Sequence, residues 1–309
     1  MRPVQGILRV VRASLLLGVV VVPMWTLSAS SREVDVWLLG GQSNMQGIAK
    51  LAELPPDLPE TIPHTFFWNG NSFEPLLLGQ TQTSTRAGEF GPEVGFALDM
   101  ATPEQPVYLV KYHASGMPLH HGWDGSQWVG DPPLAGRRNF YPGEEPDDPC
   151  QGTLYREMVA QFRAALRSFQ AEGREPRVRG FLWMQGEQDA KHVLSATSYA
   201  ASLKRLRSRL AADLGTSPDL PFAFGQVLPY EPAMERFTHR VEIRAQMAAA
   251  DMDSGQPEAM ARTKMVSTDG FGLYPDTVHY NADGQLRLGR AFASALQVMV
   301  GPRQSPVVE

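Results

Sequence analysis

A serine near the start of the chain stands in a setting that suits nucleophilic catalysis. Ser43 lies in Gly40-Gly41-Gln42-Ser43-Asn44-Met45, directly after an apolar run at 34–39 that predicts a buried strand. The two glycines permit a tight turn and close approach of a substrate. A serine hydroxyl is a weak nucleophile without a base, so Ser43 needs a partner. Taken alone, the segment also fits a serine that only caps a helix.

The segment Asp276-Thr277-Val278-His279 offers that base near the other end of the chain. His279 can take the serine proton. Asp276 is three residues earlier, where a turn would let its carboxylate hold the imidazole. An ordinary polar loop would explain this segment equally well if it stood alone. With Ser43 it predicts a nucleophile, a base and an orienting acid.

A third polar segment, Trp183-Met184-Gln185-Gly186-Glu187-Gln188-Asp189, ends the apolar run at 178–184. The amide of Gln185 could donate a hydrogen bond to a developing oxyanion. Glu187 and Asp189 could instead be a carboxylate pair that cleaves a glycosidic bond. They are only two residues apart, which is a poor spacing for flanking one bond, so the serine set explains more.

Alternating strand-like and helix-like segments must position these residues. Apolar runs predict five strands, at 34–39, 107–112, 178–184, 222–228 and 264–267. Amphipathic periodicity predicts four helices, at 153–172, 198–214, 234–252 and 285–300. This alternation predicts a three-layer α/β/α fold with a five-stranded parallel sheet. Ligands bind at the carboxyl ends of such strands, where the three polar segments would meet.

Two long stretches, 51–88 and 120–149, read as irregular loops. The second holds four aromatic residues: Trp123, Trp128, Phe140 and Tyr141. These rings could form platforms for sugar rings, or they could pin the loop to the body of the protein. We expect substrate choice to be set by these two stretches.

Composition fits a soluble globular protein of 309 residues, with 43% hydrophobic and 20% charged residues. The net charge of -5 argues against nucleic acid as a partner, because no basic surplus exists to neutralise phosphates. Cys150 is the only cysteine, which excludes an intramolecular disulfide and a thiolate zinc site. Its acidic neighbours also make it a poor nucleophile.

The N-terminus predicts a secretory signal. Arg2, Arg9 and Arg12 precede an apolar run at 13–25, and small residues follow at 28–30. The run is shorter than the roughly 20 residues that a spanning helix needs, which argues against a permanent membrane anchor. We therefore expect a signal peptide at 1–30, an exported domain at 31–301 and a tail at 302–309. Export would be to the periplasm or the extracellular space.

Three blocks of the chain together resemble those of a known superfamily. Gly-Gln-Ser-Asn-Met, Trp-Met-Gln-Gly-Glu-Gln-Asp and Asp-Thr-Val-His are similar to signature blocks of the SGNH hydrolases. Within that superfamily they resemble the sialate O-acetylesterase and family 6 carbohydrate esterase group. Further matches are Phe90-Gly91-Pro92-Glu93 and Leu288-Gly289-Arg290. The resemblance covers about residues 34–300 and implies a flavodoxin-like fold.

The resemblance also implies roles. Ser43 would be the nucleophile, His279 the base and Asp276 its orienting acid. The N–H groups of Ser43 and Gly116 and the amide of Gln185 would form the oxyanion hole. Gln42, Asn44 and Glu187 would support the site. Where the group commonly has Gly-Gly-Thr, this chain reads Ala114-Ser115-Gly116-Met117, and Gly116 is the matching glycine.

The predicted function is removal of O-acetyl groups from carbohydrate through an acetyl-serine, without a metal or other cofactor. Acetylated xylan, another plant polysaccharide and O-acetylated sialic acid all remain open as substrates. Two other classes compete with this prediction. One is a non-catalytic carbohydrate-binding protein on the same fold, which would be expected to lack a member of the triad. The other is a glycosidase or a metal-dependent hydrolase that uses His113, His120 and His121.

Overall fold

The computed structural model describes residues 33–130, 132–231 and 235–301, which belong to one compact unit. The predicted signal peptide and C-terminal tail lie outside the described residues. Within these ranges, no helix combines the length and the apolar character needed to cross a membrane.

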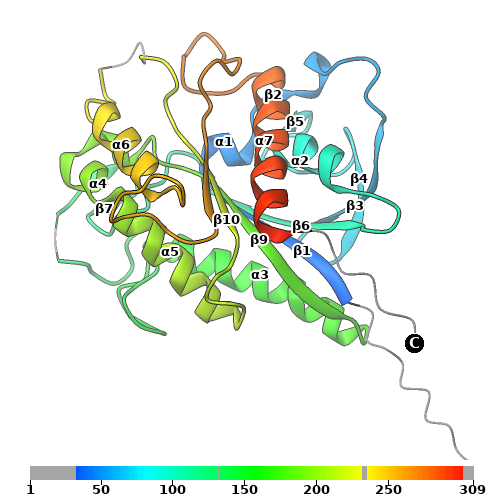
Figure 1. Ribbon diagram of the computed structural model, residues 1–309, viewed down its shortest axis with the longest axis horizontal. Coiled ribbons are helices and arrows are strands. Elements are labelled where there is room, and N and C mark those ends of the chain that lie inside the picture. The colour runs from blue at the N-terminus through cyan, green and yellow to red at the C-terminus, as the bar shows by residue number, and fades with distance from the viewer. Residues whose placement is uncertain (1–32, 131, 232–234, 302–309) are drawn as a thin grey trace, which may run out of the picture. The chain divides into compact units, whose positions relative to one another are not determined.

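Seven strands form the central sheet (Figure 1). Their order across the sheet is β11 (Thr263–Val266), β10 (Phe222–Gly225), β9 (Glu175–Met184), β1 (Glu33–Gly41), β6 (Val107–His113), β3 (Thr61–Trp68) and β4 (Phe73–Leu77). All neighbours pair in parallel except β3 and β4, which are antiparallel. Two short ladders, β2 (Ala49–Lys50) with β5 (Glu89–Phe90) and β7 (Trp123–Asp124) with β8 (Gln127–Trp128), lie outside this sheet.

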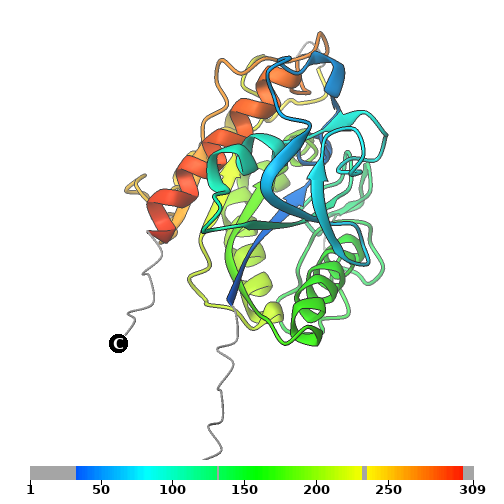
Figure 2. The ribbon, with the colours of Figure 1, turned by 90° about the vertical axis from the view of Figure 1, so that its right-hand side faces the viewer.

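Helices cover both faces of the sheet (Figure 2). One face carries α3 (Thr153–Ala171), α5 (Tyr199–Leu214) and α6 (Arg240–Ala250). The other face carries α2 (Glu93–Met100) and α7 (Ala282–Val300). Two short helices, α1 (Ser43–Gln46) and α4 (Val193–Thr197), follow β1 and β9. The three-layer α/β/α prediction is therefore confirmed, and the five predicted strands have the doubly wound order of a flavodoxin-like sheet.

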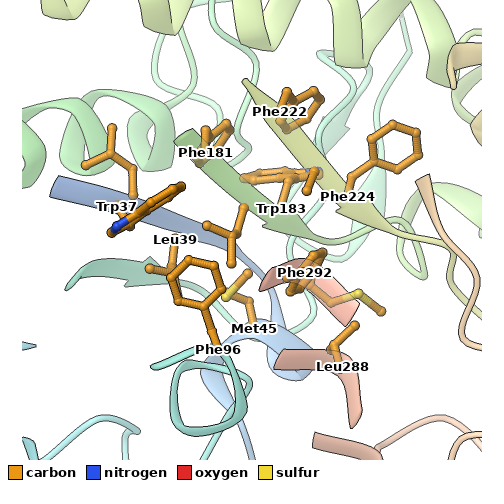
Figure 3. Close-up of a cluster of buried hydrophobic side chains, with 14 of the residues drawn as sticks. Trp37, Leu39, Met45, Phe96, Phe181, Trp183, Phe222, Phe224, Leu288 and Phe292 are labelled. Carbon is orange, nitrogen blue, oxygen red and sulfur yellow. The ribbon is translucent and has the colours of Figure 1, made fainter. Parts of the chain in front are cut away.

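The core fills both sides of the sheet with large apolar side chains (Figure 3). On one side, the Phe181 and Phe222 rings stack with their centroids 5.4 Å apart. On the other, Trp37 of β1 meets Phe96 of α2 edge to face at 5.3 Å. Because β1 is buried from Val34 onward and β9 is buried from Gly180 to Met184, their carboxyl ends hold fixed positions for the residues that follow.

The predicted strand count was wrong by two. β3 and β4 lie within 51–88, the stretch whose sequence predicts an irregular loop. Both strands are partly exposed and contain proline, at Pro63 and Pro75, so they lack the long apolar run of an interior strand. The predicted strand at 222–228 ends early at Gly225, and the helix predicted from 234 begins at Arg240.

The aromatic residues of 120–149 pin this segment to the body of the protein. The indole N–H of Trp123 donates to Ser195 Oγ at 3.0 Å. Trp128 stacks on His192 with a centroid distance of 3.5 Å, and Phe140 packs edge to face against Trp183. Trp123, Phe140 and Tyr141 are all buried. Of the two interpretations left open, packing rather than a sugar platform matches this arrangement.

Candidate active site

The ends of β1, β6 and β9 lie side by side and bring the polar segments together. Gly41 pairs with His113 on one side and Met184 on the other. The Gln42 N–H then donates to the Met184 carbonyl at 2.9 Å. Gly41 has φ +150°, and a Cβ there would lie 2.1 Å from the Met184 oxygen, so only glycine fits. This close approach puts Ser43 at the carboxyl edge of the sheet.

Ser43, His279 and Asp276 form a continuous hydrogen-bond chain. His279 Nε2 lies 3.0 Å from Ser43 Oγ, and His279 Nδ1 lies 2.6 Å from Asp276 Oδ2. In the neutral tautomer with hydrogen on Nδ1, the ring donates to Asp276 and accepts the Ser43 proton. This is the geometry in which a serine becomes a nucleophile. The structure thus brings together the three residues that the sequence predicted as a triad.

Asp276 is held by its own loop. Its Oδ1 accepts the backbone N–H groups of Val278 and His279, each at 2.9 Å. The loop closes through the Tyr274 N–H, which donates to the His279 carbonyl at 2.8 Å. Partial burial would raise the pKa of Asp276, but these N–H bonds and the His279 ring outweigh it and hold the pKa below its ordinary value. Asp276 is therefore ionised at neutral pH.

Asn44 ties the nucleophile helix to the histidine loop. Its Nδ2 donates to the Val278 carbonyl at 3.0 Å and to Glu187 Oε1 at 2.6 Å, and its Oδ1 accepts the Tyr280 N–H at 3.2 Å. Glu187 is buried, and burial raises the pKa of its carboxyl. Asn44 and Glu187 therefore fix the distance between Ser43 and His279 without touching the reacting atoms.

A buried ion pair anchors the other end of α1. Lys111 Nζ lies 2.7 Å from Glu93 Oε2 and also donates to the Gln46 carbonyl at 2.9 Å. Both side chains are fully buried, and burial lowers the pKa of Lys111. Our reading of the sequence assigned no role to Lys111. The available signal was a lysine inside the apolar run of β6, which is costly unless an acidic partner is near.

Two of the predicted oxyanion donors face the site, whereas the third does not. Ser43 and Gly116 line a cavity at the site, their N–H groups donate to no other described residue, and a Cβ at Gly116 (φ +69°) would meet open space. Gln185 is fully buried. Its Nε2 donates to Asp189 Oδ2 at 2.6 Å, and its second hydrogen is shared between the Met117 carbonyl at 3.1 Å and Gln42 Oε1 at 3.3 Å. The structure places Gln185 behind the site, which speaks against the predicted donor role.

Two cavities meet at the triad and share Ser115 and His279. The small cavity has a volume of about 190 Å³. It is lined by Gln42, Ser43, Ser115, Gly116, Glu187, Gln188, Lys191, Arg236, Phe237, Val278 and His279. The wide cavity has a volume of about 810 Å³. It is lined by Gln46, Ile48, Lys50, Thr85, Arg86, Glu89, Tyr112, His113, Ala114, Ser115, Arg138, Tyr274, Asp276 and His279.

The sequence at 33–298 matches the family described as carbohydrate esterase, sialic acid-specific acetylesterase. The chain belongs to this family. The protein is accordingly a carboxylic ester hydrolase of the carbohydrate acetylesterase type. The resemblance read from the three sequence blocks is thereby confirmed.

Several solved structures are similar to this acetylesterase in fold. A protein from Arabidopsis thaliana superposes with a TM-score of 0.62 at 18% identity, covering 86% of this chain and 99% of that one. NanS gives 0.56 at 15% identity, covering 87% and 98%. A carbohydrate acetylesterase from Xanthomonas citri gives 0.50 at 20% identity, covering 86% and 56%. A search of the curated proteins found no match.

The residues that the competing functions would use are spread over the two cavities and the interior of this esterase. His113 lines the wide cavity, but burial and the nearby Lys111 charge lower the pKa of His113 to about 3, so it is uncharged. Asp189 lines neither cavity, so it forms no carboxylate pair with Glu187 around a substrate. Within the described ranges, no three His, Cys, Asp or Glu side chains are grouped as metal ligands would be.

Proposed function

We propose that this acetylesterase works through an acetyl-Ser43 intermediate. The observation that carries the proposal is the hydrogen-bond chain from Asp276 through His279 to Ser43, at the junction of two cavities. Ser43 Oγ attacks the ester carbonyl carbon while His279 Nε2 accepts its proton. The tetrahedral adduct collapses, the bond to the sugar oxygen breaks, and His279 returns the proton to that oxygen.

Hydrolysis of the acetyl-enzyme repeats these steps with water. His279 takes a proton from water, the resulting oxygen attacks the acetyl carbon, and Ser43 leaves with the proton that His279 returns. In both halves the negative charge forms on the carbonyl oxygen, where the N–H groups of Ser43 and Gly116 can donate to it. Asp276 stays ionised and stabilises the imidazolium that forms in each step.

Each of the two cavities suits a different part of the substrate. The small one, beside the Ser43 and Gly116 N–H groups, suits the acetyl group and its oxyanion. The wide one is large enough for a sugar and is also lined by His279, which must reprotonate the leaving alcohol.

The substrate we propose is an O-acetylated acidic sugar, such as sialic acid, in preference to acetylated xylan. Arg138 lines the wide cavity, and its guanidinium has no partner among the described residues. The Arg138 backbone is fixed, because its N–H donates to Asp124 Oδ1 at 2.8 Å and its carbonyl accepts the Gly125 N–H. A free guanidinium on a fixed backbone suits a carboxylate. The family description also refers to sialic acid.

Acetate release from a panel of substrates tests this proposal. The panel contains O-acetylated sialic acid, acetylated xylan and a neutral aryl acetate. We expect the wild-type protein to have its highest kcat/KM with the acidic sugar. We expect Ser43→Ala to release almost no acetate from any of them. A preference for acetylated xylan would overturn the substrate assignment and leave the esterase mechanism standing.

We further propose that the protein is exported, on the basis of the basic, apolar and small-residue pattern of the first 30 residues. Expression of the full chain in a bacterium, followed by fractionation and N-terminal sequencing, tests this. The proposal requires protein outside the cytoplasm that begins near residues 29–31. Uncleaved protein in the cytoplasm would overturn it.

A further inference from the structure

Gln42 is the residue immediately before the nucleophile, and its side chain lines the small cavity beside Ser43 and Gly116. The side chain is only 3% exposed. Its amide oxygen accepts two hydrogen bonds from behind the cavity, from Gln185 Nε2 at 3.3 Å and from the Gln188 N–H at 3.5 Å. Both hydrogen bonds are long and therefore weak, so their main effect is to set the orientation of the Gln42 amide.

Backbone N–H groups, which can only donate, fix the orientation of the Gln185 and Gln42 side-chain amides. The backbone N–H groups of Leu119 and His120 donate to the two oxygens of Asp189, at 2.8 and 3.0 Å. The ionised Asp189 can only accept, so it takes an N–H from Gln185 at 2.6 Å. Gln185 therefore presents its nitrogen on this side, and that nitrogen also reaches the Gln42 oxygen. The Gln188 backbone N–H requires an oxygen at the same position.

The nitrogen of Gln42 must then point the other way, toward the cavity. Gln42 Nε2 donates to no described residue, and it is not among the enclosed polar atoms that lack a partner. It is therefore an open donor on the wall that also carries the Ser43 and Gly116 N–H groups. Three donors on one wall of a small cavity are suited to a tetrahedral oxyanion.

We propose that the side-chain amide of Gln42 is a third oxyanion donor, and that Gln185 and Asp189 are positioning residues that keep its nitrogen turned toward the substrate. This inference rests on the proposed acetyl-serine mechanism. It reassigns the donor role that the sequence suggested for Gln185, whose own N–H groups are used inside the protein. The bond from Gln42 Nε2 forms fully only when the carbonyl oxygen becomes negative, so it acts on turnover more than on affinity.

Steady-state kinetics with an aryl acetate test the donor role. Gln42→Met removes the donor with little change in volume, and Gln42→Glu keeps the acceptor for Gln185 while removing the donor. We expect kcat to fall by about 10²–10³ in both variants, with KM changed less than about threefold. Gln226→Met is the matched control, because Gln226 is also a buried glutamine, with its amide on the Arg244 carbonyl, and it lines neither cavity.

Comparison with Ser43→Ala separates this inference from the mechanism on which it rests. An active Ser43→Ala protein would overturn the acetyl-serine mechanism. An inactive Ser43→Ala protein together with a kcat for Gln42→Met or Gln42→Glu within threefold of wild type would overturn the Gln42 assignment alone. Melting temperatures establish that each variant is folded, and if one fails to fold the other Gln42 variant decides.

The positioning role has its own test. In Asp189→Asn the residue can donate as well as accept, so Gln185 and then Gln42 can turn over and offer oxygen to the substrate. We expect kcat to fall at least tenfold, with KM nearly unchanged. Asp189→Glu keeps a carboxylate and should recover part of that loss. If Asp189→Asn lowered only the melting temperature, or if the two variants were equally slow, the positioning role would be wrong.

Discussion

The two cavities that meet at Ser115 and His279 are lined by different parts of the fold. The small cavity is lined mainly by residues that directly follow β1, β6 and β9. The wide cavity draws on the segments around β2 and β5, on Arg138 and on the loop at 274–279. The first set follows the ends of central strands, whereas the second combines the end of β6 with short strands and loops outside the central sheet. We infer that the small side supplies the chemistry and that the wide side supplies substrate choice.

Replacing the nucleophile should have the largest effect on activity, and it tests whether the small cavity supplies the chemistry. Ser43→Ala should lower kcat for the aryl acetate and for the acetylated sugar alike, by about 10⁴–10⁶, because no other described group replaces the attacking oxygen. Ser168→Ala on α3 is the control, since Ser168 bonds only its own helix. A large loss on one substrate with little loss on the other would show that the chemistry does not reside on the small side.

The orienting acid should matter nearly as much. In Asp276→Asn the oxygen must stay on the Val278 and His279 N–H groups, so the new NH₂ faces His279 Nδ1. The imidazole is then forced to carry its hydrogen on Nε2 and can no longer accept the Ser43 proton. The loss in kcat should approach the ~10⁴ known for this change in another Ser-His-Asp enzyme. A loss under tenfold would leave Ser43 and His279 as a dyad.

On the wide side the effect should be smaller and selective. Arg138→Gln removes a charge-assisted hydrogen bond to the proposed carboxylate, so KM for the acetylated acidic sugar should rise about tenfold or more. The neutral aryl acetate should react at the wild-type rate. Arg167→Gln, on α3 and outside both cavities, is the matched control. Equal effects on both substrates would remove the distinction between the two sides.

The raised pKa of Asp189, which lies behind the small cavity, predicts that the stability of the folded protein depends on pH. Burial raises the pKa of Asp189 to about 6, above the value of 3.8 expected in the unfolded chain. The folded protein therefore holds this proton to higher pH, and the contribution of Asp189 to stability falls as pH rises from about 4 to about 6. Urea unfolding should show Asp189→Asn gaining stability relative to wild type across this window and staying level above about pH 7. A constant difference at all pH values would contradict the raised pKa.

Sequence alone located the triad because each member follows a recognisable element. Ser43 directly follows the apolar β1, and Asp276 and His279 precede α7 at a spacing that one turn can close. The interior strands β1, β6 and β9 were equally predictable, since they contain the mainly apolar runs at 34–39, 107–112 and 178–184. The strands β3 and β4, of which β4 is the edge strand, were not, because partial exposure and proline removed that pattern.

Sequence could not tell which of two neighbouring amides faces the substrate. Gln42 and Gln185 both follow strand ends, and either could have been the donor. The difference comes from Asp189 and the Leu119 and His120 N–H groups, which reach Gln185 from distant parts of the chain. In the same way, Trp123 and Phe140 suited a sugar platform until their partners were known. Contacts of this kind depend on tertiary packing, which local pattern does not encode.

Labelling with an aryl phosphonate ester tests whether Ser43 is the nucleophile, because the tetrahedral adduct on an activated serine resists hydrolysis. Intact-protein and peptide mass spectrometry are followed alongside acetate release. We expect one phosphonyl group per chain, on Ser43, with activity lost in parallel. We also expect slow labelling of His279→Ala and no labelling of Ser43→Ala. Full acetylesterase activity in a protein whose Ser43 is completely labelled would contradict the role of Ser43 as nucleophile. An active protein whose Ser43 never labels would contradict it as well.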